Sequence, residues 1–158
     1  MNNKSERGFS LIEIAIVLLI IVIASAFLVP QALAYMRMYK LGVGGRNVAT
    51  ALQRARFLAT SNNTRAGISV TDTPEVRIEQ YDHEGKTEPQ LKGIAQLPSG
   101  VFIASDAPKQ IAFDGRGVVT PMPKESLAIR VNGPRGYYLF VTVSPTGQVT
   151  VSEAKYDK

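Results

Sequence analysis

The sequence lacks most of the residues from which enzymes build metal and nucleophile sites. Its 158 residues include no cysteine, no tryptophan and one histidine, His83. Without cysteine, disulfides, thiolate ligands, cysteine nucleophiles and cysteine-linked lipids are excluded. A single imidazole gives little basis for a zinc site or a histidine base. The sequence also has no nucleophile elbow, catalytic triad or strand-linked phosphate loop. We therefore expect a protein that is not an enzyme and that holds no metal and no cofactor.

Acidic residues are absent from Ile14 to Thr71, whereas the net charge of the whole chain is +5. The cations of this stretch are Arg37, Lys40, Arg46, Arg54, Arg56 and Arg65. Residues 72–89 reverse the sign, with six acids against Arg77 and Lys86. The two segments could pair between subunits, and the basic one could meet lipid phosphates or nucleic acid. Two solvated faces of opposite sign fit the pattern equally well.

Residues 9–29 form an apolar run of 21 residues, close to the ~20 that cross ~30 Å of hydrocarbon. A secretory signal peptide fits the basic residues before the run and the A-x-A at Ala24–Ala26, but the run continues beyond that site. A plain anchor fits the length but does not explain Glu13. A charge inside a membrane helix costs at least about 2.5–3.5 kcal/mol, and less near an end. This carboxylate therefore requires a partner.

The hexapeptide GFSLIE, from Gly8 to Glu13, resembles the prepilin signature of type IV pilins and type II secretion pseudopilins. The resemblance implies that residues 1–8 are a basic leader, that a prepilin peptidase cuts after Gly8, and that Phe9 is then N-methylated. The new α-amine and the carboxylate of Glu13 on a neighbouring subunit could offset each other's desolvation. Glu13 would then set assembly and register. The simpler alternative is that Glu13 reaches the headgroups from an ordinary anchor.

Pro30 ends the segment 9–30, which we expect to be a transmembrane helix and, by the resemblance, the filament-core helix. Pilins commonly carry a helix-bending proline at this spacing, although Pro30 could simply mark the membrane exit. Apolar residues at helical spacing predict an amphipathic helix over 31–62 that stops at Asn62 and Asn63. Three glycines within 42–45 predict a flexible joint, or a short break between two helices, because each costs roughly 1 kcal/mol in a helix.

From Arg65 onward the apolar period changes to two, which predicts short strands. The expected strands are 65–70, 75–80, 101–103, 110–113, 118–119, 126–131, 137–143 and 148–152. Residues 81–90 are polar and are expected to form a loop. Short strands joined by Gly- and Pro-containing turns predict an antiparallel β domain over 63–158. The expected fold class is α+β, with a long N-terminal helix covering one face of an antiparallel, β-sandwich-like domain.

Three further segments resemble the GspH/FimT branch of minor pseudopilins and minor pilins. They are Leu52–Ala59 with the following Asn62-Asn63-Thr64, the hairpin Ile111–Val118, and the hairpin Val143–Val149. The resemblance implies a minor pseudopilin of a type II secretion system, built into a periplasmic pilus-like filament that drives protein export. It also implies a single pass through the inner membrane, with the N-terminus cytoplasmic and the domain periplasmic. The implied partners are other pseudopilin or pilin subunits, the prepilin peptidase, the membrane and secreted cargo.

Two alternatives remain open at this point. One is a minor type IV pilin that serves pilus assembly or DNA uptake, and the other is a membrane-tethered binding domain without a filament. Some DNA-uptake members carry Gly-Arg-x-Arg in the last hairpin, but here Gly147–Thr150 contains no arginine. The terminal cations Lys155 and Lys158 are diluted by Glu153 and Asp157. DNA is therefore a disfavoured partner, kept open by the basic helix.

Overall fold

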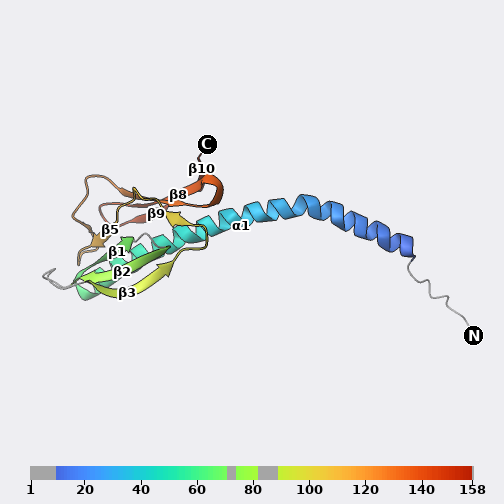
Figure 1. Ribbon diagram of the computed structural model, residues 1–158. Helices are drawn as coiled ribbons and strands as arrows, with labels where there is room; N and C mark the ends of the chain where they lie inside the picture. Colours follow the sequence, from blue (N-terminus) through green and yellow to red (C-terminus); the bar gives the residue numbers. More distant parts are fainter. Residues whose placement is uncertain (1–9, 71–73, 82–88, 158) are drawn as a thin grey trace, which may run out of the picture. The chain divides into compact units, whose positions relative to one another are not determined.

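The computed structural model describes residues 10–70, 74–81 and 89–157. The chain divides into two compact units, Met1–Met36 and Arg37–Lys158. One continuous helix, α1 (Leu11–Asn62), contributes residues to both units (Figure 1). The β strands all belong to the second unit.

The described part of the first unit is the beginning of α1, and its side chains are exposed throughout. The exposed side chains include large aliphatic ones, with Leu18 57% and Ile20 60% exposed. By length and composition alone, α1 contains a stretch that could cross a membrane. A helix suits that role because it satisfies its backbone hydrogen bonds internally. Pro30 lies inside α1, which continues on both sides of it.

In the second unit α1 buries one stripe of small and aliphatic side chains. Leu41, Val48, Leu52, Ala55 and Ala59 recur at helical spacing, seven positions apart for the first pair and three or four for the rest, and each is fully buried. This spacing confirms the amphipathic helix predicted there.

The helix ends where the sequence predicted. Asn63 adopts the left-handed conformation, with φ 48°, and the N–H of Thr64 donates to the carbonyl of Ala59 at 3.0 Å. This is the hydrogen bond of a Schellman cap, in which a left-handed residue follows the last helical one. The pair of asparagines therefore terminates α1 by a capping interaction.

Two antiparallel sheets complete the second unit. The first has the order β3-β2-β1-β5-β6 and comprises β1 (Arg65–Val70), β2 (Glu75–Tyr81), β3 (Gln90–Gln96), β5 (Gln110–Phe113) and β6 (Val119–Thr120). The second has the order β10-β8-β7-β4, with β9 also paired to β8. It comprises β4 (Phe102–Ile103), β7 (Leu127–Asn132), β8 (Tyr137–Val143), β9 (Val149–Val151) and β10 (Lys155–Tyr156). A short 3₁₀ turn, η1 (Pro134–Gly136), joins β7 to β8.

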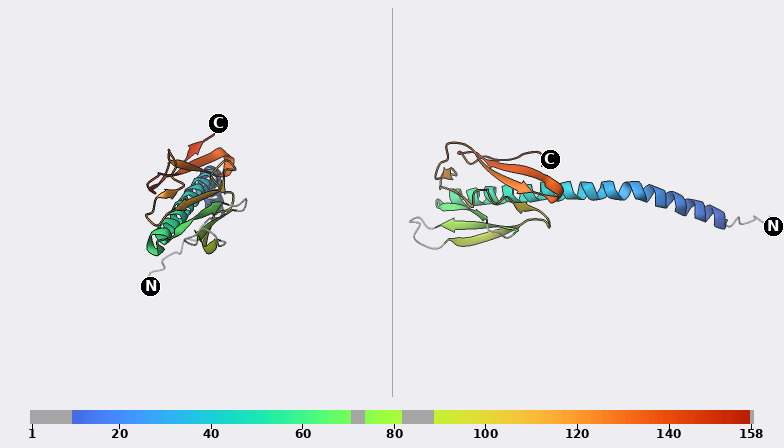
Figure 2. Two further views of the ribbon diagram at one scale, coloured as in Figure 1. Left: turned by 90° about the vertical axis from the view of Figure 1, so that its left-hand side faces the viewer. Right: turned by 45° about the horizontal axis from the view of Figure 1, so that its top comes forward.

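In the second unit α1 runs between the two sheets (Figure 2). Its buried stripe and apolar residues of both sheets belong to one hydrophobic cluster. Ile68 and Ile78 face each other across β1 and β2 of the first sheet, and Ile129 and Val141 do so across β7 and β8 of the second. All four belong to one hydrophobic cluster with the helix. The α+β class with antiparallel sheets is confirmed. The helix covers one face of each sheet, because it lies between the two.

Two strands were missed by the sequence reading. β3 falls partly in the expected loop, and its sequence QLKGIAQ contains a glycine and lacks a clear alternation. Its residues are exposed or half-buried on both faces, so no periodic signal is imposed on them. β10 has only two residues. Of the expected loop 81–90, Tyr81 and Gln90 belong to strands, and residues 82–88 lie outside the described residues.

The glycines at 42–45 do not interrupt the helix. α1 runs through them without a break, so the predicted short break is wrong. Gly44 and Gly45 are buried, and neither has room for a larger side chain. A Cβ on Gly44 would lie 2.7 Å from Cγ1 of Val101, and one on Gly45 would lie 2.7 Å from Cδ1 of Leu139. These two glycines therefore let the helix pack closely against Val101 and Leu139, which the sequence did not predict.

Replacing Gly44 and Gly45 together by alanine should therefore lower the free energy of unfolding by about 1–3 kcal/mol, because the added methyl groups overpack the core. Chemical denaturation of the detergent-solubilised chain, followed by circular dichroism, measures the change. Gly42→Ala is the matched control. No atom lies within 4 Å of a Cβ at that position, so alanine should stabilise the helix by up to about 1 kcal/mol. Equal stabilities of the two variants would contradict the close-packing role.

Candidate functional site

Glu13 is the predicted site residue that the structure describes in most detail. It lies in the first turn of α1, where the helix dipole favours a negative charge. The carbonyl of Ser10 accepts hydrogen bonds from the N–H groups of Glu13 and Ile14, at 3.0 and 3.2 Å. Ser10 and Glu13 have the spacing of a capping box, a local signal that the sequence reading missed. The carboxylate thus occupies a favourable place on its own helix, before any partner is considered.

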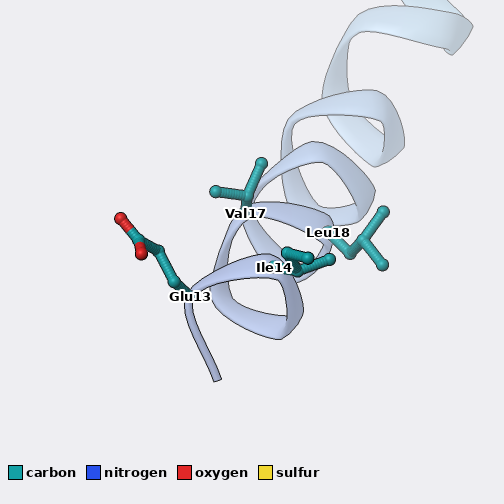
Figure 3. Close-up of a pocket in the computed structure, with 4 residues that line it drawn as sticks. All are labelled: Glu13, Ile14, Val17 and Leu18. Atoms are coloured by element: carbon teal, nitrogen blue, oxygen red, sulfur yellow. The ribbon is translucent and has the colours of Figure 1, made fainter. Parts of the chain in front are cut away.

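The surroundings of Glu13 are otherwise apolar. A shallow hollow beside it is lined by Ile14, Val17 and Leu18, which are aliphatic side chains of the next turn (Figure 3). In Figure 3 the carboxylate of Glu13 points away from Ile14 and Leu18, toward open space. No cation among the described residues forms an ion pair with it. The arrangement offers a single negative charge at the edge of an aliphatic surface.

Of the other predicted site residues, the structure describes Pro30. Gly8 and Phe9, the predicted cleavage and methylation positions, lie outside the described residues, as does His83. Pro30 is on the same helix but 17 positions further on, which corresponds to roughly 25 Å at the helical rise. Glu13 and Pro30 therefore act at separate places along α1.

A second constellation, which the sequence reading missed, surrounds Arg56 in the second unit. The Nε–H of Arg56 donates to the carbonyl of Gly117 at 3.1 Å, and an Nη2–H donates to the carbonyl of Thr146 at 3.3 Å. These acceptors belong to two different hairpin turns, one in each sheet. The turns also meet directly, because the N–H of Val119 donates to the carbonyl of Pro145 at 3.1 Å. Arg56 therefore ties the helix to both sheets at one point.

Glycine is required in both turns. Gly117 and Gly147 have φ of 78° and 82°, which side chains rarely adopt. A Cβ on Gly147 would lie 2.2 Å from the carbonyl oxygen of Gly117 and 2.9 Å from Nε of Arg56. The hairpins expected at Ile111–Val118 and Val143–Val149 turn here, since the N–H groups of Gly117 and Gly147 donate to the carbonyls of Asp114 and Ser144 respectively. What the sequence could not indicate is that the two turns touch.

Asp114 organises the first of these turns. One carboxylate oxygen accepts from the N–H groups of Arg116 and Val118, both at 3.0 Å, and the other from the guanidinium of Arg116. Burial by itself raises the pKa of Asp114, but the hydrogen bonds from Val118 and Arg116 and the charge of Arg116 outweigh it, so the pKa is lowered. A lowered pKa stabilises the folded state above the unfolded pKa, and this contribution is lost as the pH falls through the folded value.

The outer face of the first sheet carries a polar network. The carboxylate of Glu79 accepts from the hydroxyls of Ser69 and Tyr81, at 2.7 and 2.9 Å, and the amide of Gln110 donates to the Tyr81 hydroxyl. Burial, the hydrogen bond to Glu79 and the charge of Glu79 raise the pKa of Tyr81. The guanidinium of Arg65 lies over the Tyr81 ring. Each of these groups has a partner in the network, which therefore stabilises the sheet.

The described residues offer little to a metal or to DNA. They contain no group of three or more His, Asp or Glu residues placed to hold a metal ion. In the last hairpin, Gly147 forms the turn and Val149–Val151 is strand β9, without an arginine. Arg56, the cation nearest to this turn, donates to backbone carbonyls. No phosphate-binding arrangement is formed there.

Comparison with known proteins identifies two parts of the chain. Residues 3–29 match the family model of the prokaryotic N-terminal methylation motif, and residues 45–147 match that of type II transport protein GspH. None of the curated proteins matches the chain.

Solved structures show the same fold. The type IV minor pilin FimU of Pseudomonas aeruginosa strain PAO1 superposes with a TM-score of 0.60 at 14% identity, covering 75% of this chain and 92% of FimU. The minor pseudopilin EpsH from the Type 2 Secretion System of Vibrio cholerae gives a TM-score of 0.55 at 14% identity, covering 72% of this chain and 97% of EpsH. At this identity the likeness concerns the fold.

Removing the Arg56 contacts should loosen the junction between the two turns. We expect Arg56→Ala to lower the free energy of unfolding by about 1.5–3 kcal/mol, the range for hydrogen bonds from a charged group. Hydrogen exchange at the amide of Val119, which donates across the junction, should become faster. Arg54→Ala removes the same charge two positions away from an exposed side chain, and should change stability by no more than about 0.5 kcal/mol. Equal effects of the two substitutions would show that charge alone matters.

Proposed function

The chain belongs to the type II transport protein GspH family, and on that premise we propose that it is a minor pseudopilin of a type II secretion system. In this proposal it is a structural subunit that enters a periplasmic pilus-like filament and contributes to protein export by assembling. One observation carries the proposal. A methylation motif over residues 3–29 and a GspH domain over residues 45–147 stand in one chain, joined by one continuous helix.

Maturation is the first step of the proposed mechanism. A prepilin peptidase hydrolyses the peptide bond between Gly8 and Phe9, which releases the basic leader and leaves an α-amine on Phe9. N-methylation of that amine follows. The match of residues 3–29 to the N-terminal methylation motif supports both steps. After the cut, the new amine stands four residues before Glu13 in the sequence.

Assembly is the second step, and it depends on Glu13. In the membrane, a carboxylate at the edge of an aliphatic surface is favoured when a cation compensates it. The α-amine of Phe9 on a neighbouring subunit supplies that cation once the two helices dock in register. The exposed aliphatic side chains beside Glu13 then pack in the filament core. Glu13 therefore selects one register among many similar apolar contacts.

The proposed location follows from the same elements. Residues 9–30 anchor the chain in the inner membrane, with the leader on the cytoplasmic side and residues 63–158 in the periplasm. Pro30 removes one helical hydrogen bond, which lets α1 bend as it passes from the membrane into the filament. The partners are other pseudopilin subunits, the prepilin peptidase and, at the outer surface of the filament, secreted cargo.

A minor type IV pilin is the second candidate, because the fold of FimU is shared as fully as that of EpsH. The two candidate functions predict different effects of deleting the gene. Loss of the gene should stop export of secreted proteins if the chain is a pseudopilin, and should stop pilus assembly if it is a pilin. Measuring both in the same deletion strain distinguishes them.

We expect the mature chain purified from membranes to begin at N-methylated Phe9. Intact-mass spectrometry measures this directly. Gly8→Val should block the cut and leave the leader in place, because the peptidase is expected to require glycine before the scissile bond. An unprocessed Met1 in the wild-type chain would refute both maturation and the filament role that depends on it.

Glu13→Gln should insert into the membrane normally and fail to enter the filament. Removing one partner of a buried ion pair leaves the other uncompensated at about 3–5 kcal/mol, which corresponds to more than a hundredfold in an equilibrium. Carbonate extraction measures insertion, and crosslinking to sheared filaments measures incorporation. Glu13→Asp keeps the charge and should retain part of the incorporation. Normal incorporation of the glutamine variant would rule out the register role.

A further inference from the structure

Several segments far apart in the sequence meet where α1 enters the second unit. The ammonium of Lys40 donates to the hydroxyl of Ser99 at 3.2 Å. A Cβ on Gly133 would lie 3.2 Å from Cβ of Leu41, and one on Gly100 would lie 3.6 Å from Cγ of Pro134. Lys40 and Leu41 of the helix therefore lie against the loops at 98–101 and 133–136.

The C-terminal strand joins the same end of the unit. The N–H of Asp157 donates to the carbonyl of Gly136 at 2.9 Å, and the rings of Tyr137 and Tyr156 pack with centroids 5.1 Å apart. This places β10 beside the turn that contains Arg135. Helix, loops and C-terminus together form one surface, which we call the basal surface. Its exposed or half-buried charged and aromatic residues are Arg37, Tyr39, Lys40, Arg135, Lys155 and Tyr156.

The basal surface is cationic. Its four cations stand beside two described acids, Asp157 and Glu153, and Glu153 is exposed two positions before Lys155. The carboxylate of Asp157 pairs with the guanidinium of Arg130. The two exposed tyrosines, Tyr39 at 70% and Tyr156 at 58%, add amphipathic rings. Cations and tyrosines together are typical of a membrane–water interface.

Arg135 occupies a backbone position that is unfavourable for arginine. Its φ of 60° and ψ of 35° lie in the left-handed region, where glycine or asparagine is favoured. The side chain is exposed, so no packing of the core explains the choice. An exposed cation held in a strained turn is a feature that binding to an external anion would explain.

The position along the chain brings this surface near a membrane. A hydrocarbon core of about 30 Å takes about 20 helical residues, so a span that starts at Leu11 ends near Pro30. Arg37 and Lys40 follow Pro30 by only seven and ten residues. The cations begin where lipid phosphates can attract them.

We infer that the basal surface binds the anionic headgroups of phospholipids, and so holds the domain against the membrane before the subunit enters a filament. The inference rests on the proposed membrane insertion, but it requires neither leader cleavage nor filament assembly. Each cation near an anionic surface contributes about fivefold to the ratio of docked to undocked domain. Entry into a filament must displace these contacts, so anionic lipid retards extraction of the subunit.

The test uses the full chain in phospholipid vesicles. The absence of cysteine allows a single label, placed at Ser105→Cys, an exposed position in the loop after β4 that belongs to none of the basal segments. Energy transfer from the label to an acceptor lipid reports docking. Vesicles of phosphatidylcholine alone are compared with vesicles that contain about one third phosphatidylglycerol. We expect stronger transfer in the anionic vesicles, and its loss in 0.5 M salt, as about a 3–5 Å Debye length implies.

The variant Arg135→Asn/Lys155→Gln removes two basal cations, and asparagine suits the left-handed turn. It should reduce the docked-to-undocked ratio roughly twentyfold in anionic vesicles. Lys92→Gln/Lys124→Gln removes the same charge from exposed positions outside the basal surface and should have no effect. Equal transfer in neutral and anionic vesicles, or equal effects of the two double variants, would overturn the inference. Transfer that rises with protein-to-lipid ratio would identify a second copy as the occupant and also overturn it.

Flotation of the same samples distinguishes this inference from the proposed function. A chain that floats with the vesicles but does not dock refutes the lipid contact alone. A chain that does not float refutes the membrane anchor, and with it both proposals.

Discussion

The second unit depends on how closely a helix can approach two sheets at once. α1 lies between the sheets, so its buried stripe has neighbours on both sides and has room only for small residues where the approach is closest. Gly44 and Gly45 meet Val101 and Leu139 there, and alanines continue the stripe toward Asn62. Because the helix fills the space between the sheets, each sheet needs the helix to bury its apolar face. The core is therefore three layers that exist only together.

Polar contacts hold the three layers together at the end of the unit where the turns of Gly117 and Gly147 lie. The side chain of Arg56 projects from the helix beside the apolar stripe and donates to a carbonyl in each of two hairpin turns. A hydrogen bond from the N–H of Val119 to the carbonyl of Pro145 joins the two turns directly. The turns need glycine at 117 and 147 for both conformation and space. The segments on which the family resemblance rested are thus parts of one junction. Their separate sequence patterns have a common structural cause.

Sequence reasoning succeeded where one local pattern determines one feature. The long apolar run, the amphipathic stripe of α1, its stop at Asn62 and the strand at Tyr137–Val143 each follow from periodicity or capping. It failed where partners are distant in sequence. Glycines at 44 and 45 were interpreted as a joint or a break because Val101 and Leu139 are remote in sequence. The role of Arg56 was not predicted because its acceptors lie 61 and 90 residues away. For Glu13 the sequence indicated the residue, while the partner proposed for it belongs to another molecule.

The continuous helix also has a mechanical consequence. A force applied along the part of α1 in the first unit is carried by helical hydrogen bonds into the core of the second unit, since α1 is uninterrupted from Leu11 to Asn62. This force acts parallel to the apolar contacts between the helix and both sheets. Many of these contacts must therefore break together before the helix slides out. The helix is mechanically weakest at Pro30, where one of its backbone hydrogen bonds is missing. Under tension the chain should therefore yield first in its anchor, with the folded domain left intact.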